Sequence, residues 1–255
     1  MSAVGVEKQF GAVGGVLSGL VVGAAVSEAI STGCAPIDSL LGGGLERGTI
    51  TQVYGPPAAG KTNLALSAAV EVAAAGDRTV YIDTEGLSLD RFTQMAAEKG
   101  DPDEIGERLV ISEVHDFEEQ REAVREASEL AGDADLIVLD SATGFYRLER
   151  TGSENGEALR AVARQLTTLL GVARRHELAV LVTNQVYTDP DSDQAKPLGG
   201  HTLAHWTGVV LRLDRFRGGQ RRARLEKHRS QPAGGTTRFS ITASGLAGAE
   251  SRETP

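Results

Sequence analysis

Cysteine is nearly absent from this sequence, and two other residue types are almost as rare. The 255 residues include one cysteine (Cys34), one tryptophan and two methionines. A single thiol cannot form an intramolecular disulfide, so a reduced, cytosolic setting is expected. Cys34 itself is expected to be a small buried apolar residue. Hydrophobic residues make up 40% of the chain, which excludes a disordered protein and suffices for a globular core.

Lysine is also scarce, with five of the 26 basic residues, and the formal net charge is −9. Such a composition suits a salt-rich cytoplasm or a GC-rich genome, and the sequence does not separate the two. It disfavours indiscriminate binding to nucleic acid at low salt, because the overall field repels anions. The charge is uneven, however, since residues 212–238 contain nine Arg or Lys and two acids.

Long hydrophobic runs are absent apart from one stretch near the N-terminus. Residues 10–26 carry no charge, but they are 17 residues long and glycine-rich, at the lower limit for a membrane span. A signal peptide is one interpretation, and a wrongly assigned translation start is favoured over it. We expect residues 1–27 to be a poorly ordered extension, residues 28–247 one domain, residues 248–255 a disordered tail, and no membrane partner.

Short apolar runs alternate with helical patterns from residue 49 onward. Strands are predicted at 49–55, 79–83, 108–114, 135–140 and 178–184, and helices at 61–76, 88–100, 116–132 and 156–176. Nearly continuous apolar strands joined by helices are typical of a parallel sheet covered on both faces. After residue 205 the helical patterns stop, and three alternating segments predict antiparallel strands. The sequence therefore predicts an α/β fold, with a mostly parallel twisted sheet and antiparallel strands at its C-terminal edge.

A glycine-rich segment between the first strand and the first helix fits the pattern G-x-x-x-x-G-K-[ST]. It is "GPPAAGKT", residues 55–62, and its flanks are those of a phosphate-binding loop, or P-loop. Backbone N–H groups and the helix N-terminus favour bound phosphates there. The candidate nucleotide-binding residues are Gly55, Pro56, Pro57, Ala58, Ala59, Gly60, Lys61, Thr62 and Asp140.

The type of each polar residue indicates its chemistry. Lys61 is expected to reach the terminal phosphates of ATP, and the Thr62 hydroxyl to coordinate Mg²⁺. Asp140 ends the strand "LIVLD" at the edge where open α/β sheets bind ligands, and is expected to hold Mg²⁺ through water. Glu85 lies just beyond another strand and is expected to orient the attacking water. The alternative for Glu85 is a solvated loop acid.

These motifs, in this order, resemble the archaeal branch of the RecA-type recombinases. The segment "STGCAPIDSLLGGGLERGTITQVYGPPAAGKT" is followed at family spacing by "YIDTEG", "LIVLDS", "VTNQVY" and "KPLGGHTLAH". The resemblance covers roughly residues 28–247 and implies a RecA-like P-loop ATPase core. Two departures from the strand-exchange protein RadA, "EKHRSQP" at residues 226–232 and the lack of an N-terminal helix-hairpin-helix domain, resemble its archaeal paralogues.

For such paralogues the resemblance implies a helper role in homologous recombination and DNA repair, with weak ATP hydrolysis and no strand exchange. It implies DNA, single-stranded or branched, as a ligand, and RadA and a Holliday-junction resolvase as partners. A homo-oligomer is also possible. It implies that Gln185 senses the γ-phosphate and that His201, after a hinge at Gly199–Gly200, is a second sensor. The alternatives are that Gln185 only caps its strand and that His201 is a surface histidine.

In such ATPases the segment after the "NQ" strand holds DNA-facing loops, but "TDPDSDQAK" is acidic here. The basic segment "RFRGGQRRAR", residues 215–224, predicts a hairpin instead, with its turn at Gly218–Gly219. It lies far along the chain from the P-loop, so we expect it to be separate from the nucleotide site. The candidate DNA contacts are Arg217, Arg221 and Arg222.

Lys227 and Arg229 follow the hairpin, and two functions stay open for them. They could bind DNA, or reach a neighbouring subunit's γ-phosphate as a finger, as in hexameric P-loop ATPases with a K-x-R pattern. A solvated edge that blunts strand pairing is the third interpretation of the whole basic segment. For the protein, the alternatives are a KaiC-like ATPase or signalling switch that never touches DNA, and a recombination scaffold in which ATP only sets conformation.

Overall fold

The computed structural model of the protein describes residues 29–145, 155–188 and 195–248. The expected N-terminal extension, residues 249–255 of the expected tail and the centre of the acidic loop lie outside these ranges. The helices are α1 (Ala35–Leu41), α2 (Lys61–Ala74), α3 (Leu89–Ala96), α4 (Pro102–Gly106), α5 (Phe117–Leu130), α6 (Asn155–His176) and α7 (Gly200–Trp206). The strands are β1 (Ile50–Tyr54), β2 (Thr79–Asp83), β3 (Leu109–Glu113), β4 (Leu136–Asp140), β5 (Ala179–Asn184), β6 (Val186–Thr188), β7 (Ala195–Pro197), β8 (Val209–Arg215), β9 (Gln220–Lys227), β10 (Thr236–Thr242) and β11 (Gly245–Gly248).

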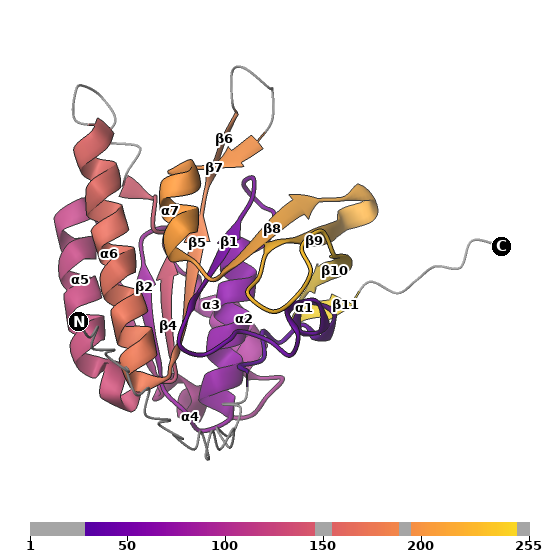
Figure 1. The fold of residues 1–255 in the computed structure, drawn as a ribbon. Coiled ribbons are helices and arrows are strands. Elements are labelled where there is room, and N and C mark those ends of the chain that lie inside the picture. Colours follow the sequence, from indigo (N-terminus) through magenta and orange to yellow (C-terminus); the bar gives the residue numbers. More distant parts are fainter. Residues whose placement is uncertain (1–28, 146–154, 189–194, 249–255) are drawn as a thin grey trace, which may run out of the picture.

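The main sheet has nine strands in the order β11-β10-β9-β8-β1-β5-β4-β2-β3 (Figure 1). The six strands β8, β1, β5, β4, β2 and β3 are parallel to one another. The strands β9, β10 and β11 continue the sheet in antiparallel register. This arrangement confirms the predicted mostly parallel sheet with an antiparallel edge. One expectation was wrong: β8 is parallel to β1 and antiparallel only to β9. The reason is that the chain crosses back through α7 before it enters β8, as a parallel connection requires.

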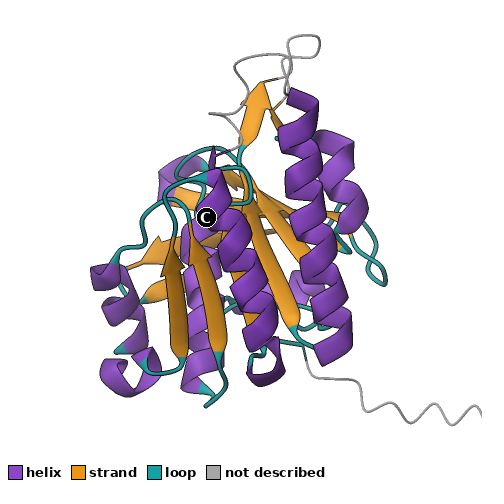
Figure 2. Cartoon of the chain, turned by 90° about the vertical axis from the view of Figure 1, so that its left-hand side faces the viewer, coloured by secondary structure: helices purple, strands orange, loops and turns teal. Residues whose placement is uncertain are grey.

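Apolar side chains fill both faces of the central strands. In β4, Ile137 and Leu139 contact the core beneath α5 and α6, whereas Leu136 and Val138 contact the core beneath α2. Because successive side chains of a strand point to opposite faces, a strand buried on both faces needs the continuous apolar run seen in the sequence. Figure 2 shows the helices on the two sides of the sheet.

The helix starts agree with the capping residues in the sequence. The Ser88 hydroxyl accepts a hydrogen bond from the Arg91 amide, and the Asp116 carboxylate accepts one from the Glu119 amide. Each cap satisfies a backbone donor that the first helical turn leaves free. The helix expected over 88–100 is shorter, because its regular part, α3, ends at Ala96.

Three short helices, one small hairpin and the last strand of the main sheet escaped prediction. They are α1, α4, α7, the two-stranded sheet β6–β7, and β11. The helix α1 has Pro36 in its first turn and ends at Gly42, whose φ of 81° is left-handed. In front of it, Cys34 is buried as expected, and burial raises the pKa of its thiol to about 11.

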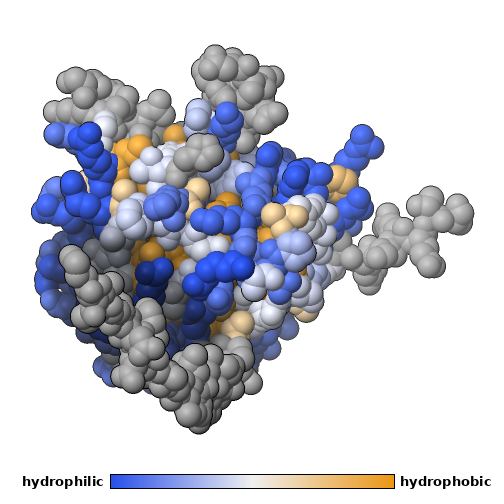
Figure 3. Space-filling model, in the orientation of Figure 1, coloured by the Kyte–Doolittle hydropathy of each residue, from blue (hydrophilic) through white to orange (hydrophobic). Residues whose placement is uncertain are grey.

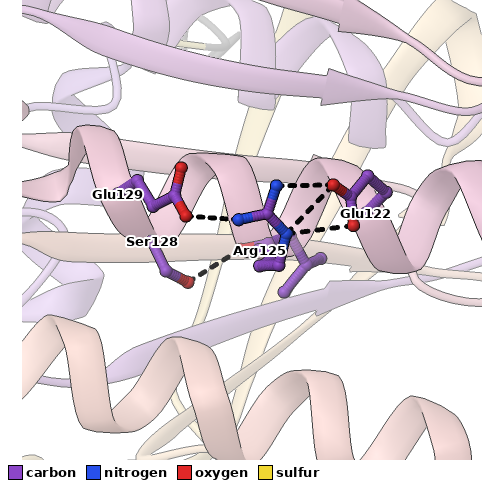
Figure 4. A network of polar contacts seen from close by, with 5 residues as sticks. Glu122, Arg125, Ser128 and Glu129 are labelled. Atoms are coloured by element: carbon purple, nitrogen blue, oxygen red, sulfur yellow. Dashed lines mark hydrogen bonds and ion pairs between the residues drawn. The ribbon is translucent and has the colours of Figure 1, made fainter.

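Polar side chains cover most of the face in Figure 3, where apolar residues form only small separate patches. On the outer side of α5, Arg125 lies between Glu122 and Glu129 and pairs with both (Figure 4). Water screens such exposed pairs, so they favour the helix only slightly. Among the described residues, no helix is both long and apolar enough to cross a bilayer.

Candidate nucleotide site

The P-loop leaves the carboxyl end of β1 and leads into α2. Ala58, with φ 60°, and Gly60, with φ 103°, both have left-handed backbone conformations. Gly55 has no room for a side chain, because a Cβ there would lie 2.1 Å from the Leu213 carbonyl oxygen of β8. A Cβ on Gly60 would lie 3.1 Å from Ile241 of β10. The glycines are therefore needed where the loop packs against the C-terminal strands.

The ammonium group of Lys61 lies inside the loop. Its Nζ donates hydrogen bonds to the carbonyl oxygens of Gly55, at 3.1 Å, and Pro56, at 3.3 Å. Burial lowers the pKa of Lys61, while the nearby carboxylates of Glu85 and Asp140 act in the opposite direction. Neutral carbonyl oxygens thus hold the Lys61 cation inside the loop.

Asp140 is 1% exposed and lies where β4 ends. Its carboxylate accepts hydrogen bonds from the hydroxyls of Tyr81, at 2.9 Å, and of Thr183, and the nearby Thr62 hydroxyl also favours its ionised form. Burial raises the pKa of Asp140, and these hydrogen bonds partly offset the rise. Thr62 and Asp140, the two residues expected to hold Mg²⁺, therefore lie close to each other.

Glu85 and Gln185 meet at the same edge of the sheet. Oε1 of Glu85 accepts hydrogen bonds from Gln185 Nε2, at 2.7 Å, and from Ser141 Oγ, at 2.8 Å. Together with the P-loop these residues enclose a cavity of about 270 Å³. Its lining residues are Pro57, Ala58, Gly60, Lys61, Thr62, Asn63, Glu85 and Gln185. His201 belongs to α7, but its side chain lies outside the part of the structure described.

Sequence reasoning missed the residues that support the site. Tyr81 and Thr183 bind Asp140, and Ser141 binds Glu85. The Asp83 carboxylate accepts hydrogen bonds from the amides of Glu85, Gly86 and Leu87 and so shapes the turn that carries Glu85. Only Asp83 had a recognisable signal, because an Asp at a strand end commonly bonds to the amides that follow it.

Backbone and side-chain bonds tie Gln185 to the base of the β6–β7 hairpin. The Gln185 carbonyl oxygen accepts a hydrogen bond of 2.8 Å from the Leu198 amide. Next to it, the buried amide of Asn184 donates to the Leu198 carbonyl and accepts from the Thr143 hydroxyl. These bonds connect Gln185, at the cavity, to the base of the hairpin that precedes α7.

The predicted basic hairpin is present, formed by β8 and β9 with a turn of 3-10 helix at Arg217–Gly219. Its arginines do not share one face. Ala223 and Leu225 are buried in the core beneath α1 and α2, and alternation along β9 places Arg221 on their side. Arg222 and Arg224 are exposed on the opposite face.

That opposite face gathers several positive charges. Arg222 stands opposite Arg238 of β10, and both guanidinium groups lie over the ring of Phe216, at 5.9 and 4.4 Å from its centroid. Asp214 partly neutralises this face through contacts with Arg212 and Arg222. We call the exposed residues Arg222, Arg224 and Arg238, together with the half-buried Phe216, the arginine face.

The hairpin is not separate from the nucleotide site, contrary to expectation. Arg221 Nε donates a hydrogen bond of 3.1 Å to the carbonyl oxygen of Ala58 in the P-loop. Because β8 is parallel to β1, its carboxyl end and the hairpin turn lie at the same edge of the sheet as the P-loop. Distance along the sequence therefore gave a wrong expectation about distance in space.

Lys227 and Arg229 lie near the other end of β9 and are engaged within the chain. Lys227 Nζ donates hydrogen bonds of 2.7 Å to the carbonyl oxygens of Ala204 and Thr207, at the C-terminus of α7. A cation at this position also complements the helix dipole. Arg229 forms an exposed ion pair of 2.8 Å with Glu46.

A P-loop at the carboxyl end of a parallel sheet, with an acid at the end of a strand two positions away, defines a P-loop nucleotide-binding protein with a RecA-like core. The sequence model of the Rad51 family matches residues 26–249. The chain therefore belongs to the Rad51 family, and its relatives place it among the RadB proteins of that family.

Two relatives and one solved structure illustrate the similarity. DNA repair and recombination protein RadB of Halobacterium salinarum is 62% identical over 221 residues, which cover 85% of this chain and 94% of that protein. The protein of the same name from Methanococcoides burtonii is 41% identical over 223 residues, 87% and 98% of the two chains. A crystal structure of the RadB recombinase has a TM-score of 0.76 at 40% identity and covers 87% of this chain and 100% of that one. These matches confirm the expected fold.

Proposed function

We propose that the protein is an ATP- and DNA-binding accessory protein of homologous recombination and DNA repair, with weak ATPase activity and no strand exchange of its own. One observation carries the proposal. Lys61, Thr62, Glu85 and Gln185 line a single cavity from separate segments of a Rad51-family chain, and the buried Asp140 lies near Lys61 and Thr62. Names of the relatives refer to DNA repair and recombination, which supports this role over a KaiC-like signalling switch.

The residues present fit ATP with Mg²⁺. Lys61 supplies a buried cation for the phosphates, and the hydroxyl of Thr62 and the carboxylate of Asp140 are oxygen ligands of the kind that Mg²⁺ takes. Bound Mg²⁺ would neutralise charge that develops on the phosphates. The raised pKa of Asp140 also fits, because a buried carboxylate without a cation is unfavourable when ionised.

Glu85 is proposed to orient the water that attacks the γ-phosphate. One of its oxygens, Oε1, already accepts bonds from Ser141 and Gln185, which leaves Oε2 as the main acceptor for water. Gln185 is proposed to sense the γ-phosphate through its contact with Glu85 and to transmit the change to the β6–β7 hairpin. His201 remains the proposed second sensor.

DNA is proposed to contact Arg217 and the arginine face. Arg217 is exposed at the turn, and Arg222 and Arg238 bring two cations beside an aromatic ring. Guanidinium groups bind phosphates, and aromatic and guanidinium planes can stack on bases of single strands. Arg221 points to the other face and is assigned a separate role below. Lys227 and Arg229 stay open between DNA and a finger on a neighbouring subunit, and contacts with RadA and a resolvase rest on the family resemblance.

The test combines two assays on the full chain. Binding of fluorescent single-stranded DNA at several salt concentrations up to near-molar, with and without ATP, tests the DNA-binding role. Steady-state phosphate release with and without DNA tests the ATPase. DNA binding that is absent at every salt concentration would refute the recombination role in favour of the signalling switch. Nucleotide binding without any phosphate release would favour the scaffold in which ATP only sets conformation.

A further inference from the structure

Arg221 joins the beginning of β9 to the middle of the P-loop. Its Nε–H donates to the Ala58 carbonyl at 3.1 Å, and its Nη1 donates to the carbonyls of Gly219, in the hairpin turn, and Gln220, the latter at 3.2 Å. One planar guanidinium therefore bridges two backbone segments 163 residues apart. The residues beside it on the same face, Ala223 and Leu225, are buried, so the strand that carries Arg221 is fixed by the core.

The segment that Arg221 holds is conformationally costly. Ala58 has φ 60°, a left-handed conformation that L residues other than glycine adopt at a cost in free energy. The peptide plane after Ala58 is bonded at both ends, because its carbonyl accepts from Arg221 and the Ala59 amide donates to the Pro56 carbonyl at 3.2 Å. A planar peptide held at both ends cannot rotate. Without Arg221, the turn from Pro56 to Ala59 would be held by only one of these two restraints.

We infer that Arg221 is a positioning residue for the P-loop and that it couples the basic hairpin to nucleotide binding. It acts through Ala58, by holding the loop in the conformation that receives phosphate. DNA on Arg217 at the hairpin turn would shift the turn, and the bonds of Arg221 to Gly219 and Gln220 would transmit that shift to the loop. The positioning role stands on the geometry alone, whereas the coupling rests on the DNA binding proposed above.

The first experiment measures binding of ATP with Mg²⁺ to the full chain in the absence of DNA. Arg221→Ala is expected to weaken binding on the order of tenfold, because removing a charge-assisted hydrogen bond leaves the loop less ordered. The matched control is Arg175→Ala, which removes the same charge from an exposed position in the last turn of α6, outside the nucleotide site and the proposed DNA surface. Its affinity is expected to stay within about twofold of the unchanged protein.

A second variant distinguishes a positioning role of Arg221 from a general effect on the stability of the fold. Arg221→Lys keeps the charge and the apolar stem but not the fork that bridges the loop and the turn. It is expected to melt close to the unchanged protein, yet to bind ATP more weakly than Arg175→Ala does. ATP affinity of Arg221→Lys and Arg221→Ala within about twofold of the unchanged protein would overturn the positioning role, whatever their melting temperatures.

The coupling is tested by titrating ATP with and without saturating single-stranded DNA. In the unchanged protein DNA is expected to change ATP affinity by about fivefold or more, as coupled sites do. In Arg221→Ala the change is expected to disappear, even at DNA concentrations that saturate the variant. An equal change in both proteins would overturn the coupling. If the unchanged protein binds no DNA, the coupling falls with the proposed function, while the first titration still decides the positioning role.

Discussion

The side-chain amide of Gln185 donates a hydrogen bond of 2.7 Å to the carboxylate of Glu85, across 100 positions of the sequence. The bond exists because β2 and β5 end at the same edge of the sheet and each is followed by a polar residue at that edge. The bond joins Glu85, the candidate for orienting water, to Gln185, the candidate sensor of the γ-phosphate. Substituting either residue is therefore expected to affect the other's function.

Replacing Glu85 by Gln is expected to abolish most ATP hydrolysis and leave ATP binding nearly unchanged. The amide keeps an oxygen for Ser141 but lacks the carboxylate needed to draw a proton from water. A loss of roughly 10²- to 10⁴-fold in turnover is typical of removing such a group. Phosphate release and equilibrium titration of ATP measure the two effects separately. Unchanged turnover would leave Glu85 as a solvated loop acid.

Replacing Lys61 by Ala is expected to remove most of the affinity for ATP. The substitution deletes the cation that already lies against the Gly55 and Pro56 carbonyls inside the loop. Charge-assisted hydrogen bonds of this kind contribute roughly 1.5–3 kcal/mol each. Titration of the folded variant is compared with Lys99→Ala, which removes a lysine paired with Glu71 away from the site. Equal ATP affinity in both variants would exclude the assignment of Lys61.

Replacing Asp140 by Asn is expected to stabilise the nucleotide-free protein and to weaken Mg²⁺-dependent ATP binding. Burial raises the pKa of Asp140 in the folded state above its unfolded value, so stability falls as the pH rises through that range. An ionised Asp140 is therefore unfavourable in the folded protein, and asparagine cannot carry that charge. Thermal melting at pH 7 is expected to show a Tm higher by a few degrees.

Asp83→Asn is the matched control for this prediction. Asp83 is also buried, but its carboxylate accepts three backbone hydrogen bonds, which an amide with a single acceptor oxygen cannot reproduce. This variant is expected to melt at a lower temperature. A fall in Tm for Asp140→Asn as well would mean that the hydrogen bonds to Asp140 outweigh the cost of its burial.

Neutralising Arg217 and Arg222 together is expected to weaken DNA binding and flatten its salt dependence, with ATP affinity unchanged. Removing one arginine that binds a phosphate should lower the log–log salt slope on single strands by about 0.7. Arg221 is left in place, because its contact with the P-loop would mix the two readouts. An unchanged slope would move DNA binding to another surface and leave the arginine face as a solvated edge or a protein-docking surface.

Replacing Lys227 by Met is expected to lower the Tm, whereas replacing Arg229 by Ala is expected to leave it almost unchanged. Lys227 donates two hydrogen bonds to carbonyls at the end of α7, while the pair between Arg229 and Glu46 is exposed and screened by water. Thermal melting of the two variants side by side measures the difference. An unchanged Tm for Lys227→Met would favour a role for this lysine in binding DNA or a neighbouring subunit.

The sequence was sufficient for the central strands, the longer helices and the P-loop, because their signals are local. Apolar runs, capping residues such as Asp116 and the glycine-lysine pattern depend on neighbours within a few residues. The helix α7 escaped notice because Gly199 and Gly200 indicate a turn rather than a helix start. The expectation that residues 1–27 form a poorly ordered extension stays a prediction.

Contacts across the sheet could not be predicted, because they depend on strand register. Tyr81 and Thr183 reach Asp140 only because β2 and β5 flank β4 in this order. The direction of Arg221 follows from its position in β9 relative to Ala223, since a shift of one residue would turn it to the other face. The hairpin turn indicated that a hairpin exists, but not which of its arginines faces the P-loop.

The buried position of Cys34 makes this chain convenient for site-specific labelling. At 1% exposure and with a pKa of about 11, its thiol is protonated and shielded near neutral pH. A thiol-reactive fluorophore would therefore leave it unmodified in the folded protein. A second cysteine placed at Arg217, an exposed turn position, would be labelled selectively without removing the native one. A single such probe would report movement of the hairpin as ATP and DNA are added.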